Sequence, residues 1–384
     1  MKNCQTFFKL QILCFAKIYK GWIINMTSRQ RVLNTFAYEK TDRVPINYSA
    51  NGGINERLKK HFGVTPGGKL DLVDYLHVDF RGMGAPYTGP RLHFGDPERG
   101  INADPLWGQR TRWINHSYGG YEDNCEFPLK DADEQAVADY PMPNPDDFDY
   151  AAALEYCKEE RNGRDRAIFA GGAGLADIIN VNGRFRTMEQ AFIDLITADP
   201  AGTLLTERRL DIEFKITERL LDKCKGHIDF LWMGEDLGTQ RGPIISLELF
   251  RKEIRPRHQK FIYLAKSYGL PVMMHCCGSS SFAFEDFIEM GVNSVDTLQP
   301  EAADMSPEYI KKTFGGRLAF HGGVSTAGPL AFGSAEEAVA DVTHKLDVYA
   351  PGGGYMFSPA HMIQDNTPTG NVVEVYKKVL EYRS

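Results

Sequence analysis

Residues 271–298 read PVMMHCCGSSSFAFEDFIEMGVNSVDTL, in which a short apolar run precedes a helical stretch and a second apolar run follows Gly291. This order is typical of parallel strands joined by a crossover helix. The pattern recurs from about residue 165, and it predicts strands at 167–171, 228–233, 271–275, 294–298, 317–321 and 354–358. Two more strands are predicted upstream, at 44–49 and 76–80. Eight strands alternating with helices predict a closed (β/α)8 barrel, also known as a TIM barrel.

One long segment interrupts this alternation. Residues 84–150 are rich in Pro, Gly, Asp and aromatic residues, and a bare loop of that length is uncommon. We expect an insertion folded over the C-terminal mouth of the barrel, with a β-hairpin formed by RTRWINHS (110–117) and GYEDNCEFPL (120–129). Residues 26–384 are predicted to form one barrel domain. Residues 1–25 precede the well-formed start TSRQRVLNTF, and we expect them to be a disordered extension or the product of a mis-assigned start.

The composition favours a globular protein that acts on a small molecule. Hydrophobic residues make up 42% of the 384 residues and charged residues 25%, which is enough apolar material for a large core. A net charge of -7 disfavours nucleic acid or an anionic membrane as a partner. No apolar run approaches the ~20 residues that cross a bilayer. Seven scattered cysteines do not resemble a disulfide framework, so a reducing, cytoplasmic location is expected.

Polar residues gather where the predicted strands end. (β/α)8 enzymes carry their working groups at the C-terminal ends of strands, so residues at these ends are the candidates for chemistry. The candidates are Asp79, Glu235, Asp236, Gln240, His275, Cys277, Gln299, His321 and His361.

His275-Cys276-Cys277 is the strongest local signal among them. Successive side chains of an extended chain point to opposite faces, so His275 and Cys277 can converge while Cys276 faces the other way. Imidazole nitrogen and thiolate sulfur are good zinc ligands. His361 is the predicted third ligand, and either Glu235 or Asp236 is an alternative third or fourth.

Several of these candidates also have a structural alternative. A buried cysteine beside a hydrogen-bonded histidine would explain the first pair without a metal. Glu235 and Asp236 could accept hydrogen bonds in a turn or at a helix start, and Asp79 could be a hydrogen-bond acceptor of the barrel.

Four blocks of the chain, in order, resemble the uroporphyrinogen decarboxylase superfamily, whose fold is a (β/α)8 barrel. They are TSRQRVLNTFAYEKTDRVPI, GEDLGTQRGPIISLELFRKEIRP, LQPEAADMSPEYIKKTFGGRLAFHGGV and GGGYMFSPAHMIQDNTPTGNVVEVY, and the similarity runs from Met26 nearly to the C-terminus.

The resemblance to the decarboxylase itself is weaker where the chemistry lies. Its M-R-Q-A-G-R segment after the first strand, which holds the substrate carboxylates, corresponds here to NYSANGG, without an arginine. The tyrosine expected after the third strand is also missing from GLADIINVNG. Asp79 and His361 do match the decarboxylase's aspartate and late histidine.

The methyltransferase branch of the superfamily resembles the chain more closely. That branch binds zinc through H-x-C and a later cysteine; His275-x-Cys277 matches the first part, and His361 falls at the position of the later cysteine. The resemblance implies zinc-dependent transfer of a methyl group from methylcobalamin, carried by a separate corrinoid protein, to a thiol. It also implies a possible homodimer.

The remaining candidates receive supporting roles in this hypothesis. Catalytic functions are predicted for Glu235, Asp236 and Asp79, and substrate contacts for Gln299, His321 and Gln240. Porphyrinogen-type decarboxylation and a non-catalytic binding barrel are the alternatives.

Overall fold

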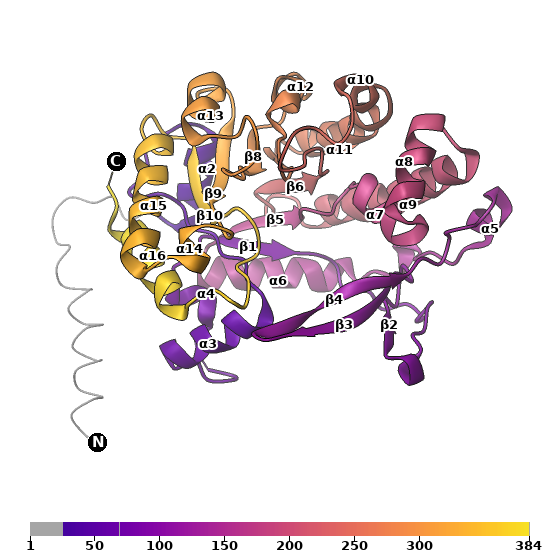
Figure 1. The fold of residues 1–384 in the computed structure, drawn as a ribbon, viewed down its shortest axis with the longest axis horizontal. Coiled ribbons are helices and arrows are strands. Elements are labelled where there is room, and N and C mark those ends of the chain that lie inside the picture. The colour runs from indigo at the N-terminus through magenta and orange to yellow at the C-terminus, as the bar shows by residue number, and fades with distance from the viewer. Residues whose placement is uncertain (1–25, 69, 384) are drawn as a thin grey trace.

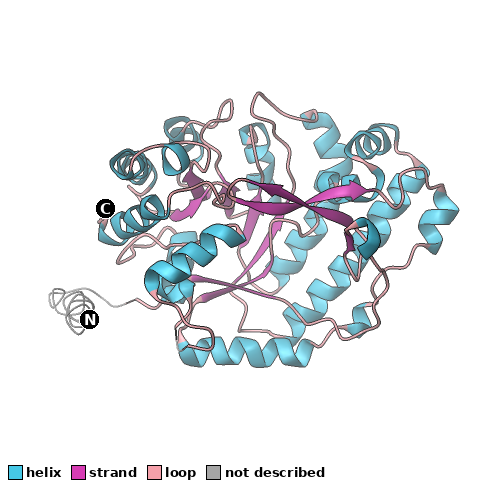
Figure 2. Cartoon of the chain, turned by 60° about the horizontal axis from the view of Figure 1, so that its bottom comes forward, coloured by secondary structure: helices cyan, strands magenta, loops and turns pink. Residues whose placement is uncertain are grey.

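The computed structural model describes residues 26–68 and 70–383, and the predicted extension at 1–25 lies outside this range. Its centre is a curled parallel sheet of seven strands in the order β1-β5-β6-β7-β8-β9-β10, with helices around the outside, as in a TIM barrel (Figures 1 and 2). The strands are β1 (Phe80–Met83), β5 (Ala167–Gly171), β6 (Phe230–Gly234), β7 (Val272–His275), β8 (Ser294–Thr297), β9 (Ala319–Val324) and β10 (Tyr355–Pro359).

The predicted strand at 44–49 is reduced to a bridge between β10 and the start of β1. Ile46 pairs in parallel with Phe357, and Asn47 N donates to Phe357 O at 2.8 Å. On the other side, Asp79 N donates to Ile46 O at 2.8 Å. Pro45 has no N–H to extend this ladder. The segment therefore links the two edge strands of the curled sheet without forming a full strand of its own.

The predicted strand at 76–80 begins later than expected. His77 has a φ of 53°, a left-handed conformation in which an extended chain cannot continue, and β1 starts only at Phe80. Asp79 therefore lies at the N-terminal end of its strand. The other six predicted strands overlap β5 to β10.

Helices connect and cover the strands. Three short turns are 3-10 helices (Pro97–Arg99, Pro145–Asp147 and Ser281–Ala283), and Phe250–Ile254 is a π-helical turn. The α-helices are α2 (Ser28–Phe36), α3 (Gly52–Phe62), α4 (Leu72–Tyr75), α5 (Glu134–Asp139), α6 (Tyr150–Gly163), α7 (Ile179–Arg186), α8 (Met188–Thr197), α9 (Pro200–Lys223), α10 (Leu247–Leu249), α11 (Arg255–Ser267), α12 (Phe284–Met290), α13 (Pro307–Phe314), α14 (Pro329–Phe332), α15 (Ala335–Tyr349) and α16 (Thr369–Glu381).

The insertion contains the predicted hairpin. β3 (Arg110–His116) and β4 (Gly119–Glu126) pair antiparallel, and β2 (Ile101–Ala103) joins them as a third strand. The hairpin tip reaches toward α3 in Figure 1. A Cβ at Gly119 would lie 2.4 Å from Asp365 Oδ2, in the loop after β10. The tip therefore rests at the C-terminal mouth of the barrel.

Aromatic side chains fill the barrel below this mouth. The rings of Phe169 and Trp232 are 5.0 Å apart, and Phe230 contacts both Phe169 and Phe80. Phe36 of α2 packs 5.2 Å from Phe230, so α2 covers the N-terminal end. Among the described helices, none combines the length and apolar character that spanning a bilayer requires.

Candidate metal centre

His275 and Cys277 converge at the C-terminal end of β7. His275 is the last residue of this strand, and its Nε2 lies 3.4 Å from Cys277 Sγ. Cys276 points the other way, where its buried Sγ accepts a hydrogen bond from Leu237 N. The alternation expected of an extended chain therefore persists past the end of the strand.

Asp236 joins this pair from the loop after β6. Its Oδ1 accepts a hydrogen bond from Cys277 N at 2.9 Å and lies 3.5 Å from His275 Nε2. Its Oδ2 accepts from Asn180 Nδ2 at 2.9 Å. The two loops touch backbone to backbone, since a Cβ at Gly278, which has a φ of +69°, would lie 2.3 Å from Gly238 O. Glycine at this position thus allows the close approach that brings Asp236 to Cys277.

The spacing of the three side chains fits zinc. Tetrahedral zinc with bonds of about 2.0–2.3 Å needs donor atoms about 3.3–3.8 Å apart. The distances from His275 Nε2 are 3.4 Å to sulfur and 3.5 Å to oxygen, and all three ligand atoms lie within 4.8 Å of one another. Within the described part of the chain, this is the cluster with the geometry of a metal site. Three protein ligands would leave a fourth position for a substrate.

A carboxylate behind His275 orients its ring. Asp296 Oδ2 lies 2.6 Å from His275 Nδ1, and Asp296 Oδ1 lies 2.6 Å from Nδ1 of His321. When a histidine donates Nδ1–H to a carboxylate, its Nε2 is the atom that can bind a metal. Asp296 was not among the candidates from the sequence, although an acidic residue near the end of a buried strand was an available signal.

Charges in the cluster reinforce one another. Burial acts to lower the pKa of His275, but its hydrogen bonds with Asp236 and Asp296 outweigh burial and raise that pKa well above the usual value. Burial acts to raise the pKa of Asp236, yet the His275 side chain and the Cys277 N–H hold it below its ordinary value. Without a metal, the imidazole therefore carries a proton that a metal ion would replace.

Glu235 faces away from the cluster. Its fully buried carboxylate accepts hydrogen bonds from Ile178 N at 2.8 Å and Ile179 N at 2.9 Å, at the start of α7. Burial raises the pKa of Glu235 to about 7. The structural alternative, an acceptor at a helix start, describes this residue, and its geometry does not support the predicted catalytic role.

Asp79 lies at the opposite end of the barrel from the cluster, and this position does not support the predicted catalytic role. Its completely buried carboxylate pairs with Arg31 Nη1 at 2.7 Å and Arg43 Nη1 at 2.6 Å, and it accepts a hydrogen bond from Ile46 N at 2.8 Å. The late start of β1 places it there. Asp79 ties α2 and the bridging segment to the base of the sheet.

His361 is not part of the cluster formed by Asp236, His275 and Cys277. Its neighbours Ala360 and Ile363 are buried and anchored, because Ala360 N donates to Val324 O and Ile363 N donates to Ser49 O. The two residues between these anchors are exposed. His361 is therefore exposed and outside the cluster, and the structure does not place it as the third ligand.

The three residues predicted to contact substrate occupy different environments. Gln299 supports the loop after Cys277, since its Oε1 accepts a hydrogen bond from Gly278 N at 3.2 Å. Gln240 is exposed at the rim, where its carbonyl accepts from Ala303 N. His321 is 1% exposed, so it does not have the surface that a substrate contact needs.

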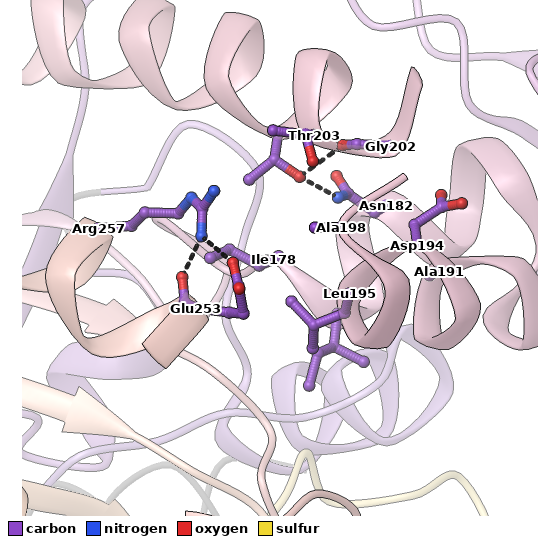
Figure 3. A pocket seen from close by; sticks show the side chains of 12 residues that line it. Ile178, Asn182, Ala191, Asp194, Leu195, Ala198, Gly202, Thr203, Glu253 and Arg257 are labelled. Carbon is purple, nitrogen blue, oxygen red and sulfur yellow. Dashed lines mark hydrogen bonds and ion pairs between the residues drawn. The ribbon is translucent and has the colours of Figure 1, made fainter. Parts of the chain in front are cut away.

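A small cavity lies beside α7, α8 and α9, and none of Asp236, His275 and Cys277 lines it (Figure 3). Its lining includes Asn182, Asp194 and Glu253. The volume of about 20 Å³ is room for roughly one water molecule, so the cavity is no substrate site.

Comparisons with known proteins agree with this architecture. Residues 235–382 match the family model of uroporphyrinogen decarboxylase (URO-D). No protein of curated function matches the sequence significantly. A solved structure of a methyltransferase from Methanosarcina mazei has a TM-score of 0.59 and 20% identity, over 93% of this chain and 99% of that one. At such low identity this likeness concerns the fold. The family match therefore confirms the resemblance to the uroporphyrinogen decarboxylase superfamily over residues 235–382, and the solved structure supports the fold.

Proposed function

We propose that this protein is a zinc-dependent methyltransferase that moves a methyl group from methylcobalamin, carried by a separate corrinoid protein, to a small thiol. The observation that carries the proposal is the spacing of Asp236, His275 and Cys277, which fits three ligands of a tetrahedral zinc ion. A fold shared with a methyltransferase supports the reaction class.

The charge of the ligand set also suits a thiol substrate. Asp236 and a Cys277 thiolate together carry two negative charges, which balance a divalent ion. A set of one histidine and two cysteines, as in zinc alcohol dehydrogenase, has the same balance. His361 in place of Asp236 would leave the centre one charge more positive. Asp236 therefore supplies the charge that the expected later cysteine would have supplied.

The protein's own groups would hold and orient the reactants. Asp296 fixes the His275 ring, while Asn180 and the Cys277 N–H hold the Asp236 carboxylate. Bound zinc would lower the pKa of a coordinated thiol enough to give the nucleophilic thiolate near neutral pH. The hairpin at the barrel mouth would shield the thiol from bulk water, and a corrinoid protein would dock there. Such chemistry suits the cytoplasm, where thiols stay reduced.

Decarboxylation is the rival that the name of the family model suggests. Asp79, the residue matched to the decarboxylase's aspartate, is enclosed by Arg31, Arg43 and Ile46 at the far end of the barrel. Turnover of uroporphyrinogen by the purified protein would nevertheless favour this rival over methyl transfer.

Metal analysis tests the proposal directly. We expect one zinc per chain after dialysis, and loss of that zinc in Cys277→Ser and Asp236→Asn. Cys276→Ser and His361→Ala are the matched controls, because Cys276 faces away from the cluster and His361 lies outside it. The zinc-loaded protein should demethylate methylcobalamin when a small thiol such as dithiothreitol is added. Zinc retained by Cys277→Ser, or lost from His361→Ala, would contradict the proposed ligand set.

A further inference from the structure

Three residues on neighbouring strands form a row across the barrel. Asp296 of β8 is the register partner of His275 on β7 and of His321 on β9. Paired residues of parallel strands direct their side chains to the same face of a sheet. The Asp296 carboxylate therefore lies between the two imidazoles, with one oxygen 2.6 Å from each Nδ1.

The hydrogen bonds define which atom donates at each step of the row. Tyr48 N donates to Asn47 Oδ1 at 2.8 Å, so the Asn47 amide group faces His321 and its Nδ2 lies 3.1 Å from His321 Nε2. An amide NH₂ only donates, which makes His321 Nε2 the acceptor. His321 Nδ1 therefore carries the proton that Asp296 accepts.

His321 has no free surface for a ligand. Its ring meets Trp232 edge to face at 5.3 Å and Phe80 at 5.5 Å, and both of its nitrogens are already hydrogen-bonded. Any contribution of His321 to the metal centre must therefore pass through Asp296.

We propose that Asp296 and His321 are positioning residues of the metal centre, in which His321 locks the Asp296 carboxylate and Asp296 presents His275 Nε2 to the metal. This inference rests on the zinc site of the proposed function. It assigns a role in metal affinity to His321, a residue that touches neither the metal ligands nor the substrate space.

The expected effects are those of an outer-shell partner, whose removal typically weakens metal binding 10–100-fold. Asp296→Asn would turn an NH₂ group toward one of the two Nδ1–H donors, so at least one imidazole would lose its acceptor. His321→Phe would keep an aromatic ring beside Trp232 and Phe80 but leave Asp296 Oδ1 without its partner.

Zinc dissociation constants, measured by competition with a chromophoric chelator, test the proposal. We expect Asp296→Asn to weaken zinc binding by about 10–100-fold and His321→Phe by roughly tenfold. Ser294→Ala is the matched control. Ser294 lies on the same strand, two residues before Asp296, and its buried hydroxyl has no hydrogen-bond partner among the described residues. The control should bind zinc like the unsubstituted protein.

A double-mutant cycle separates positioning from a general loss of packing. If His321 acts only through Asp296, His321→Phe should weaken zinc binding in the unsubstituted background and have less than about a twofold effect in Asp296→Asn. Equal effects in the two backgrounds would overturn the proposal, as would zinc binding by Asp296→Asn within twofold of the original.

Further outcomes keep this inference distinct from the proposed function. Zinc bound by the unsubstituted protein but unaffected by either substitution refutes only the positioning roles, whereas no zinc binding at all refutes both. Long-range ¹H–¹⁵N spectra of the unsubstituted protein provide a measurement that needs no variant. They should show the His321 proton at Nδ1, and protonation at Nε2 would overturn the proposal.

Discussion

Replacing Asp79 with asparagine should destabilise the protein without changing the proposed zinc site. The carboxylate is completely buried and meets two guanidinium groups, those of Arg31 and Arg43, whose side chains are only 7% and 14% exposed. Asparagine would remove the carboxylate that pairs with the nearly buried Arg43 and would leave Arg31 paired with Asp42 alone. Breaking a buried ion pair from one side costs about 3–5 kcal/mol. An unfolding entropy of ~2.1 cal/mol/K per residue is about 0.8 kcal/mol/K for 384 residues, so the melting temperature should fall by roughly 4–6 °C.

The assay compares the melting temperature and zinc affinity of Asp79→Asn with those of Asp146→Asn. Asp146 also pairs with an arginine, Arg219, but the two side chains are 70% and 42% exposed, so its replacement should cost less than about 1 kcal/mol. Both variants should bind zinc normally. An Asp79→Asn protein that melts at the original temperature but has lost zinc binding or methyl transfer would refute the structural assignment and restore the catalytic one.

Three further predictions concern Gly234, His275 and His258. Gly234→Ala would place a Cβ 2.2 Å from Ala173 O and 2.9 Å from His275 Cβ, so zinc titration should show weakened binding; unchanged affinity would argue against the packing of β6 on β7. Because the pKa of His275 is raised, zinc must displace its proton, and zinc affinity should fall as the pH falls through the pKa of this histidine. Calorimetry in two buffers of different ionisation enthalpy should detect the proton released when zinc binds. Zinc binding without proton release would contradict this prediction. Burial lowers the pKa of His258 from 6.5 to about 4. Between pH 6.5 and pH 4, therefore, the unfolded chain binds a proton at this histidine and the folded chain does not. The free energy of unfolding should fall by up to roughly 3 kcal/mol for this reason as the pH falls from 7 toward 4. Urea unfolding at pH 7 and pH 5 should therefore show a shallower pH dependence for His258→Gln, and an unchanged slope would be the contrary result.

The sequence by itself determined the order of strands and the pair at the end of β7. Apolar runs separated by helical stretches predicted the strands from β5 to β10, because parallel strands buried on both faces need continuous apolar sequence. Alternation of side chains predicted that His275 and Cys277 share a face, since that rule acts over two residues and needs no knowledge of the rest of the chain.

Only the tertiary structure decided which side chain joins His275 and Cys277 and which end of the barrel each polar residue occupies. The choice between Asp236 and His361 depended on where two loops turn, through the close contact at Gly278 in one and the anchors at Ala360 and Ile363 in the other. The end of the barrel at which Asp79 lies depended on the left-handed conformation of His77, three positions before β1.

The row from His275 through Asp296 to His321 likewise depended on strand register. Register is fixed by how whole strands pack around a shared core, and a shift of one residue would turn each of these side chains to the opposite face. Local periodicity thus predicts which side chains can point inward, whereas the packing of distant segments decides which of these side chains come into contact.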